Sequence, residues 1–533
     1  MKKITICLFV AAALSGCKKD FLNTAPLDAY SNSTLWKSQN DALAALTGCY
    51  SGWELGDNVV YDDCISDNAY DQFPWEGYET FASGLATATD PGINKYDYTT
   101  IQKCNWFLDN IDNVPAAKID ATIKERMKAE ARFLRAYKYF VLSQNYGNVP
   151  FVEHAITPTE ANSIKQTLKA DIVNYVLSEL NTIAPSLPVS YSGSDIGRIT
   201  RGGALALKAR VELFNGKYSD CIATTQQLMK SPFSYSLYPN YSEMFRPQNA
   251  DNQEVILDAQ YLLNTNSAWV LIVLAPNSSG GWSSVAPTQS LIDSYETING
   301  KTIQNDPSYD PAQPYKNRDP RMEASIIRPG SMYMGNYFDP LSSNSSDVRG
   351  GNNASPTGYN FRKYIENLND FNGTSYGAGD LSNTGQTFIV MRYAEVLLMY
   401  AEAKIEANQV DQSVYDAINT VRTRVSMPSV TSAMYPDQAS LRTLVRRERR
   451  VELAGEGLRW YDIQRWKTAA TVLTGDVYGC QDGTVNTSNG AVTLVPNTNI
   501  NIGNRAFADK NYLWPIPQKE IDINKTLKQN NGY

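Results

Sequence analysis

Histidine is almost absent from this sequence of 533 residues, which holds only His154. A zinc site built from several histidines and a metalloprotease helix of the HExxH type are therefore excluded. A Ser-His-Asp triad would have to use His154, and no GxSxG motif supplies its serine. We expect His154 to be a structural residue whose ring is satisfied by its neighbours.

Cysteine is also scarce, and no two of the seven cysteines have the CxxC spacing. Five follow the amino-terminal segment: Cys49, Cys64, Cys104, Cys221 and Cys480. Because five is odd and no pair has the CxxC spacing, neither a disulfide scaffold nor a zinc site is predicted. We expect buried free thiols instead.

No phosphate-binding loop is present, so no nucleotide cofactor is predicted. Gly300-Lys301-Thr302 imitates the end of such a loop, but Tyr295 occupies the position of its first glycine. Asp62, Asp63 and Asp67 lack the spacing of an EF-hand. They are loop carboxylates or, as the open alternative, calcium ligands; our prediction names no metal site.

Basic residues are outnumbered, with 48 Lys and Arg against 55 Asp and Glu and a formal net charge of -7. This balance argues against nucleic acid as a partner, since binding to phosphates needs a basic surface. The chain is rich in aromatic residues instead, with 33 tyrosines and 9 tryptophans. Their faces can serve as platforms for sugar rings or peptides.

Long apolar runs are missing from the body of the chain. The run from Trp269 to Ala275 (WVLIVLA) is far too short to cross a membrane, and we expect it to form a buried strand. The apolar run Ile4 to Leu14 follows Lys2 and Lys3 and is likewise too short for a membrane span, which needs about 20 residues.

That amino-terminal arrangement predicts an export signal over residues 1–16. Because Cys17 directly follows Leu-Ser-Gly, the segment looks like a bacterial lipoprotein signal, in which Cys17 becomes the lipidated first residue. An ordinary secretory signal with an incidental cysteine is the alternative. Residues 17–33 would form the lipid anchor and tether.

Helical periodicity dominates the rest of the chain. We expect helices or helical pairs within residues 35–53, 98–111, 123–146, 164–183, 202–230, 391–424 and 441–467. Small residues at Ala209, Gly216, Ala401 and Ala417 fall where tetratricopeptide repeats need close helix contact. The predicted fold class is therefore mainly α, with a tetratricopeptide-like helical-repeat scaffold.

Two segments do not fit this scaffold, which we place at about 34–230 and 389–470 of a single domain spanning 34–533. Residues 231–388 are rich in Pro, Gly, Ser, Asn and Tyr, and predict a loop-rich, irregular subdomain on the ligand side with a few short strands. Residues 470–510 form a smaller insert in which Val477, Val492 and Leu494 indicate a hairpin.

The stretch from Leu441 to Lys467 combines an apolar helical stripe with many charges. Glu448 lies on the stripe, where an unpaired carboxylate would be costly to bury. Arginines surround it in sequence at positions 446, 447, 449 and 450, and a guanidinium can satisfy a carboxylate with two bonds. We expect a helical hairpin with a buried ion-pair network; an active site built on these arginines is the alternative.

This stretch, RRERRVELAGEGLRWYDIQRWK, resembles the motif near the carboxyl end of the SusD/RagB family, the nutrient-binding outer-membrane lipoproteins of the Bacteroidetes. The segment EARFLRAYKYFVLSQNYGNVP and the ending around Leu513-Trp514-Pro515 are also similar to that family. The resemblance implies a surface-exposed, lipid-anchored protein without catalytic activity. It also implies a SusC-like TonB-dependent transporter as partner, and an oligosaccharide or a peptide as ligand.

Binding such a ligand requires exposed rings together with amide or carboxylate groups that fix hydroxyls. Our candidates lie in loops or at their edges: Trp53, Asp67, Asn68, Tyr70, Trp75, Tyr78 and Trp282. The region around Trp282 is similar to the family's loop near the ligand. Two alternatives stay open: a polysaccharide-degrading glycoside hydrolase with a carboxylate pair, and a scaffold that binds only other proteins.

Overall fold

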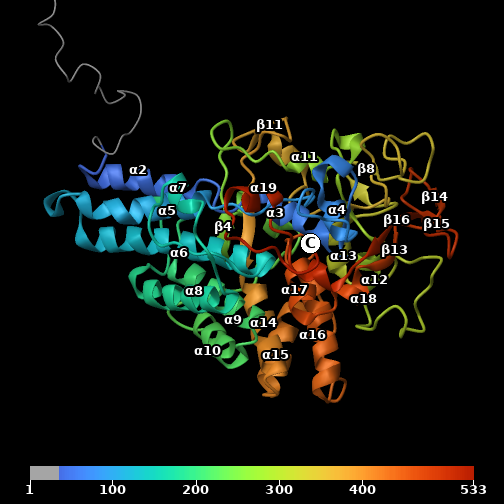
Figure 1. The fold of residues 1–533 in the computed structure, drawn as a ribbon. Helices are drawn as coiled ribbons and strands as arrows, with labels where there is room; N and C mark the ends of the chain where they lie inside the picture. Colours follow the sequence, from blue (N-terminus) through green and yellow to red (C-terminus); the bar gives the residue numbers. More distant parts are fainter. Residues whose placement is uncertain (1–34) are drawn as a thin grey trace, which may run out of the picture.

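Helices packed in succession form one side of the molecule (Figure 1). The computed structural model describes residues 35–533, so our expectations for the leader and tether lie outside the described residues. The helices of the scaffold are α2 (Gln39–Tyr50), α5 (Thr99–Asn110), α6 (Ala121–Tyr146), α8 (Lys169–Ile183), α9 (Arg201–Phe214), α10 (Tyr218–Leu228), α14 (Tyr393–Glu406), α15 (Gln412–Arg424) and α16 (Gln438–Glu452). Each of the first six packs on the next, α10 packs on α14, and α14 contacts both α15 and α16. The predicted helical-repeat scaffold is confirmed.

The longest helix, α6, shows how local sequence sets the boundaries. Asp120 caps its first turn by accepting a hydrogen bond from the Ile123 backbone N–H at 3.0 Å. Gly147, with φ of 72°, ends it where a residue with a Cβ would be strained. By contrast, α8 begins five residues later than predicted, because Gln166–Thr167 (β3) pair with Val149–Pro150 (β2).

Small buried side chains allow the paired helices to approach closely. Ala209 of α9 and Cys221 of α10 are fully buried between neighbouring helices, as are Ala401 and Ala403 of α14. Gly216 has φ of 70° at the turn between α9 and α10. The helical pairs predicted at 202–230 and 391–424 are therefore confirmed.

The other elements are short. The helices are α3 (Gly56–Tyr61), α4 (Tyr78–Ala82), α7 (Pro158–Ala161), α11 (Leu271–Leu274), α12 (Gln289–Ser294), α13 (Pro320–Ser325), α17 (Arg459–Trp466), α18 (Ala469–Val472) and α19 (Gln518–Ile523). The remaining antiparallel strand pairs are β1 (Ala69–Asp71) with β5 (Val285–Pro287), β4 (Val255–Ala259) with β12 (Phe388–Arg392), β6 (Ile326–Ile327) with β9 (Asn360–Phe361), β7 (Met332–Tyr333) with β8 (Asn336–Tyr337), β10 (Asn372–Thr374) with β11 (Gly377–Ala378), β13 (Thr474–Tyr478) with β16 (Asn501–Ala506), and β14 (Gly483–Val485) with β15 (Val492–Leu494). The insert is thus one hairpin nested inside another.

The prediction of a buried strand at Trp269 to Ala275 is wrong. Leu271–Leu274 form one helical turn, α11, which is buried apart from Ile272. A short apolar run predicts burial but cannot separate strand from helix, since both bury such residues. Across residues 35–533, no helix is both long enough and apolar enough to cross a membrane. The five cysteines of this part are buried and unpaired, as expected.

Two hydrophobic clusters fill the interior, one among the scaffold helices and one beneath the loops of residues 231–388. Helix α16 belongs to both: Leu441 and Leu444 lie in the first cluster, and Val451 lies in the second. Charged side chains gather along the same helix. The scaffold and the loop-rich part are therefore joined through α16.

The ion-pair network around Glu448 is real, but its partners differ from the prediction. Glu448 binds Arg321 of α13 and Arg422 of α15. The arginines next to it in sequence pair elsewhere: Arg446 with Glu406, Arg447 with Glu296, Arg449 with Asp462 and Arg450 with Asp67. Adjacent residues on a helix do not face one another, so the network draws its charges from other elements.

The free energy of unfolding is expected to change with pH because of Asp258 in β4. Burial raises its pKa to about 7, so the folded protein retains a proton there that the unfolded chain loses near pH 4. Stability is therefore lost as pH rises through this window. Asp258→Asn does not titrate, and its stability relative to wild type is expected to increase by about 1–3 kcal/mol between pH 5 and pH 8. Urea unfolding at the two pH values measures this, and a pH-independent difference would contradict it.

Candidate functional site

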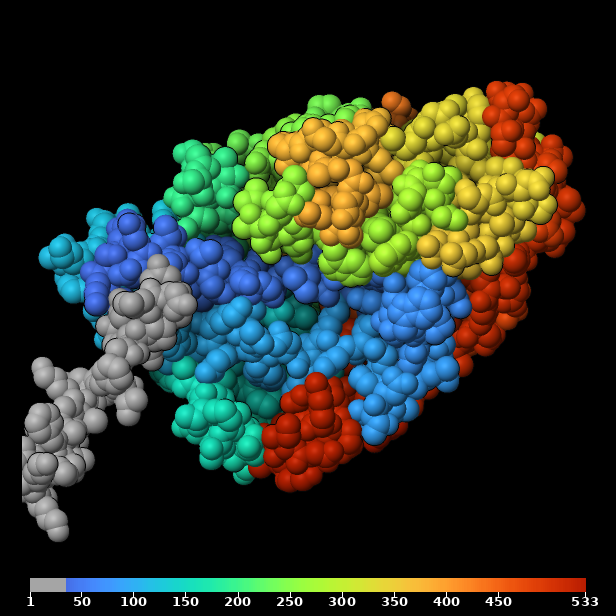
Figure 2. Space-filling view, turned by 90° about the horizontal axis from the view of Figure 1, so that it is seen from above, coloured from blue at the N-terminus to red at the C-terminus, as the bar shows by residue number. Residues whose placement is uncertain are grey.

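Two loops that each carry a tryptophan leave the same end of the β1–β5 pair. In the β1–β5 pair, Asp71 lies opposite Val285, and the Gln72 N–H donates to the Ser284 carbonyl at 2.9 Å. Because the strands are antiparallel, the segment after Asp71 lies beside the segment before Val285. Figure 2 shows the two side by side, blue near residue 75 and yellow-green near residue 280. Trp75 and Trp282 therefore belong to the same region of the surface.

Trp75 is the most exposed large apolar side chain here, with 78% of its surface accessible. Its ring stacks on Phe73, with centroids 4.6 Å apart and planes 20° from parallel. Pro74 begins the single turn that carries it, and Gly77, with φ of 86°, ends that turn. One face of Trp75 is thus supported by Phe73, while most of its surface faces solvent.

Trp282 is 38% exposed and follows two glycines. The backbone N–H of Trp282 donates a hydrogen bond to the Ile272 carbonyl at 2.7 Å. A Cβ at Gly281 would lie 2.0 Å from the Ala275 carbonyl oxygen, so only glycine allows this close approach. The loop that presents Trp282 is therefore packed firmly against α11.

A third ring, Trp269, was missed from the sequence because it stands at the start of the run assigned to a strand. It is 39% exposed, and its indole N–H donates to Asp57 of α3 at 2.9 Å. The polar residues Asn264, Asn266 and Ser267 just before it are the one sequence signal that Trp269 lies at the end of a loop and does not start a core strand.

Trp53 does not offer a free face, contrary to our expectation. It is 5% exposed and packs edge-on against Tyr137 and Phe133 of α6. The end of α2 directs it into the contact between the two helices, where its area adds to the hydrophobic core.

Asp67 and Asn68 are also buried and are engaged by arginines. Arg459 binds both carboxylate oxygens of Asp67 at 2.7 and 3.0 Å, and Arg450 binds the Asp67 carboxylate and the Asn68 side-chain oxygen. Burial alone would raise the Asp67 pKa, but Arg450 and Arg459 outweigh it and lower the pKa to about 2. These two residues therefore fasten β1 to the α16–α17 hairpin.

Tyr70 and Tyr78 lie behind the loop and are half-buried. Tyr78 stacks on Tyr61, with centroids 4.7 Å apart. Tyr70 packs over Gly503, where an added Cβ would approach its ring to 3.2 Å. Both rings support the loop that carries Trp75.

Asp71 holds that loop in shape. Its carboxyl accepts hydrogen bonds from the Phe73 and Tyr78 backbone N–H groups at 3.2 and 3.1 Å. Burial and the neighbouring carboxyl of Glu76 both raise the pKa of Asp71. Glu76 in turn accepts a hydrogen bond from the Tyr61 hydroxyl at 2.9 Å. The turn bearing Trp75 is therefore fixed from both ends before any ligand arrives.

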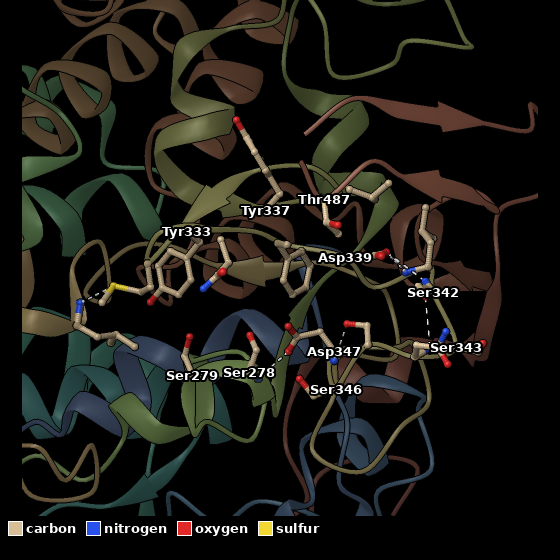
Figure 3. Close-up of a pocket in the computed structure, with 18 of the residues that line it drawn as sticks. Ser278, Ser279, Tyr333, Tyr337, Asp339, Ser342, Ser343, Ser346, Asp347 and Thr487 are labelled. Atoms are coloured by element: carbon tan, nitrogen blue, oxygen red, sulfur yellow. Dashed lines mark hydrogen bonds between the residues drawn. The ribbon is translucent and has the colours of Figure 1, made fainter. Parts of the chain in front are cut away.

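A large open cavity lies at the other end of the loop that carries Trp282 (Figure 3). Its volume is about 1040 Å³, at the upper end of ordinary ligand pockets. Ser278 and Ser279 form one wall, and the others come from residues 333–347, 368–381 and 483–487. Tyr333 and Tyr337 contribute rings, while serine, threonine and asparagine side chains supply hydroxyl and amide groups.

The cavity wall is held by two aspartates. Asp339 accepts hydrogen bonds from the Leu341 and Ser342 backbone N–H groups at 3.0 and 3.1 Å. Asp347 accepts one from the Ser278 N–H at 2.9 Å, which ties the Trp282 loop to the opposite wall. The cavity and Trp282 thus share one loop.

A second open cavity of about 620 Å³ lies between α12 and β13. It contains Asp293, whose pKa burial raises, and Asp476, whose pKa is lowered by hydrogen bonds from Asn504 and Tyr478. His154 lines neither cavity; its ring is exposed and pairs with Asp109 at 2.8 Å, as expected of a structural residue. Within residues 35–533, no cluster of three or more metal-ligating side chains occurs.

Sequence comparison identifies two families. A model described as the SusD family matches residues 242–533, and one described as starch-binding, associating with the outer membrane, matches residues 21–213. SusD-like protein P25 of Formosa agariphila is 24% identical, over 100% of this chain and 99% of its own length. The starch-binding protein SusD of Bacteroides thetaiotaomicron is 32% identical over 30% of this chain and 28% of its own.

Solved structures agree with these matches. A SusD-like carbohydrate binding protein from Bacteroides fragilis is 34% identical, with a TM-score of 0.82 over 92% of this chain and 99% of its own. A laminarin binding SusD-like protein is 25% identical, with a TM-score of 0.71 over 93% of this chain and 100% of its own. Since the first family model covers more than half of the sequence and the shared fold extends over nearly all of it, this chain belongs to the SusD family.

Proposed function

We propose that this protein binds an oligosaccharide at the cell surface without altering it, and passes it to a SusC-like TonB-dependent transporter of the outer membrane. A peptide ligand is the variant of this proposal that the exposed rings also permit. The ligand would lie on Trp75 and Trp282 and extend into the neighbouring cavity.

The exposed, stacked ring of Trp75, fixed before binding, is the observation that carries this proposal. An aromatic face offers a flat apolar area to the C–H groups of a sugar ring. Because Asp71 and Phe73 already hold the ring in place, little conformational freedom is lost on binding. The hydroxyl and amide groups of the cavity supply the directional contacts that a sugar needs.

The similar proteins support the same class of ligand. The names of three of them state binding to carbohydrate, to laminarin and to starch. The description of the second matching family associates it with the outer membrane. Together with the lipoprotein-like signal over residues 1–16, directly before Cys17, this supports a lipid anchor that holds the protein at the outer membrane. Membership of the SusD family supports a SusC-like transporter as the partner.

One experiment tests both the binding and the anchor. Cells carrying the wild-type protein are incubated with fluorescent laminarin or starch, and are compared with cells carrying Cys17→Ser. We expect retained fluorescence only with wild type, whereas the purified Cys17→Ser protein still binds the glycan in affinity gels. Equal labelling of the two cell types would contradict the anchor, and absence of binding to every glycan tested would contradict the proposed function.

The glycoside hydrolase alternative is tested in the same samples. The second cavity combines a carboxyl of raised pKa, Asp293, with a carboxylate of lowered pKa, Asp476, and hydrolysis uses such a contrast. Glycan products that accumulate with wild type and not with Asp293→Asn would support the hydrolase. Unchanged glycan supports binding alone.

A further inference from the structure

The charged side chains around the candidate site favour some classes of glycan over others. All side chains that line the large cavity lie in the described part of the chain, and none of them is lysine, arginine or histidine. Asp339 and Asp347 are the charged groups of its wall (Figure 3). An anionic ligand would therefore lie close to two largely buried carboxylates and would find no cation in the lining.

Two arginines flank the cavity wall and are already paired: Arg349 follows the lining residue Asp347 in sequence, and Arg246 is bound to Asp370, next to the lining residue Asn369. Arg349 binds Asp482 and the Cys480 carbonyl, and Arg246 binds Asp370 through two hydrogen bonds of 2.8 and 2.7 Å. Turning either side chain toward a ligand would break these charge-assisted bonds. The positive charges of Arg349 and Arg246 are therefore committed to the protein itself.

The tryptophan loops are acidic as well. Glu76 directly follows Trp75, and Asp57 accepts the indole N–H of Trp269 at 2.9 Å. Lys95 is a cation close enough to Asp57 to influence it, but its ammonium group is bound by the buried carboxylate of Asp62. Both parts of the candidate site thus carry negative charge, which disfavours carboxylated and sulfated chains by like-charge repulsion.

Neutral hydroxylated ligands fit the groups that remain. Asn336, Asn369 and Asn372 offer amides, Thr487 offers a hydroxyl, and Tyr337 adds a ring. Such groups donate to and accept from sugar hydroxyls without a net charge. We propose that the cavity is a subsite for neutral sugar residues, so that the protein selects uncharged glycans over uronate-containing or sulfated ones. This inference rests on the proposed glycan-binding function.

Affinity gels at low ionic strength test the selection. Wild-type protein is run against laminarin and starch, which are neutral, and against alginate and polygalacturonate, which carry a carboxylate on each residue. We expect retention by at least one neutral glycan, and retention by the anionic glycans weaker by a factor of about ten or more. Equal or stronger retention by an anionic glycan would overturn this inference alone. No retention by any glycan would contradict the proposed function as well.

A matched pair of variants ties the selection to the cavity. Ser343 is exposed at the cavity wall, so both substitutions leave the core untouched. Ser343→Lys adds a cation there, and Ser343→Gln adds similar bulk without charge. We expect alginate or polygalacturonate retention to increase severalfold with Ser343→Lys, to decrease again with added salt, and to remain severalfold lower with Ser343→Gln than with Ser343→Lys. The same retention in all three proteins would contradict the placement of the ligand in this cavity.

Discussion

Arg392→Met is expected to lower the free energy of unfolding by about 3–5 kcal/mol, the cost of breaking a buried ion pair from one side. Arg392 ends β12 and is 1% exposed. It donates to the carboxylates of Glu254, Glu452 and Glu456 at 2.7–2.8 Å, and to the Glu452 carbonyl at 2.7 Å. Methionine has a similar length but no charge, so three buried carboxylates would lose the partner that links the end of β12 to Glu254, just before β4, and to the end of α16.

Guanidinium unfolding of the variant and of a matched control measures this effect. Arg442 makes an equally regular pair, with two bonds of 2.7 Å to Glu406, but its side chain is 32% exposed. Arg442→Met is expected to cost less than about 1 kcal/mol, because solvent screens the pair. Arg392→Lys retains the charge without the fork and should fall between the two. If Arg392→Met is no more damaging than Arg442→Met, the buried network does not stabilise the fold as described.

The helical scaffold could be predicted because its signal is local. The apolar stripe of α6, its cap at Asp120 and its end at Gly147 all lie within one stretch of sequence. The network around Glu448 could be predicted only in part. A buried carboxylate demands a partner, and the stripe shows that Glu448 is buried. Nothing in the sequence shows that Arg321, more than a hundred residues away, supplies that partner.

The candidate site was harder to predict because its walls come from segments that are distant in sequence. The cavity combines serines near 278, a hairpin near 335 and a second hairpin near 485, none of which has a helical or alternating pattern. Exposure of a ring is also a tertiary property. Trp53 and Trp75 both stand just after a helix or loop aromatic, Tyr50 and Phe73, yet one packs on α6 and the other faces solvent. Only Trp75 has Pro74 and Gly77 beside it, the local signs of an exposed turn.

Replacing the exposed rings is expected to have the largest effect on binding. Trp75→Ala and Trp282→Ala should each weaken the affinity for a bound glycan by about 1–2 kcal/mol, roughly 5- to 30-fold, because each removes a stacking face. The double variant should bind too weakly to detect in affinity gels. Trp75→Phe retains a ring above Phe73 and should lose less than Trp75→Ala. Calorimetry with the glycan that wild type retains gives the affinities directly.

Tyr478→Ala provides the matched control, since this ring is 41% exposed but lies at the second cavity. The Tyr478→Ala variant should bind the glycan with the affinity of wild type if the ligand binds at the tryptophan loops. The melting temperatures of Trp75→Ala and wild type should also agree, because 78% of that side chain already faces solvent. A loss of affinity with Tyr478→Ala, and none with Trp75→Ala or Trp282→Ala, would move the site to the cavity between α12 and β13. The acidic groups there, Asp293 and Asp476, would then face the ligand, and the choice between binding and hydrolysis would depend on them.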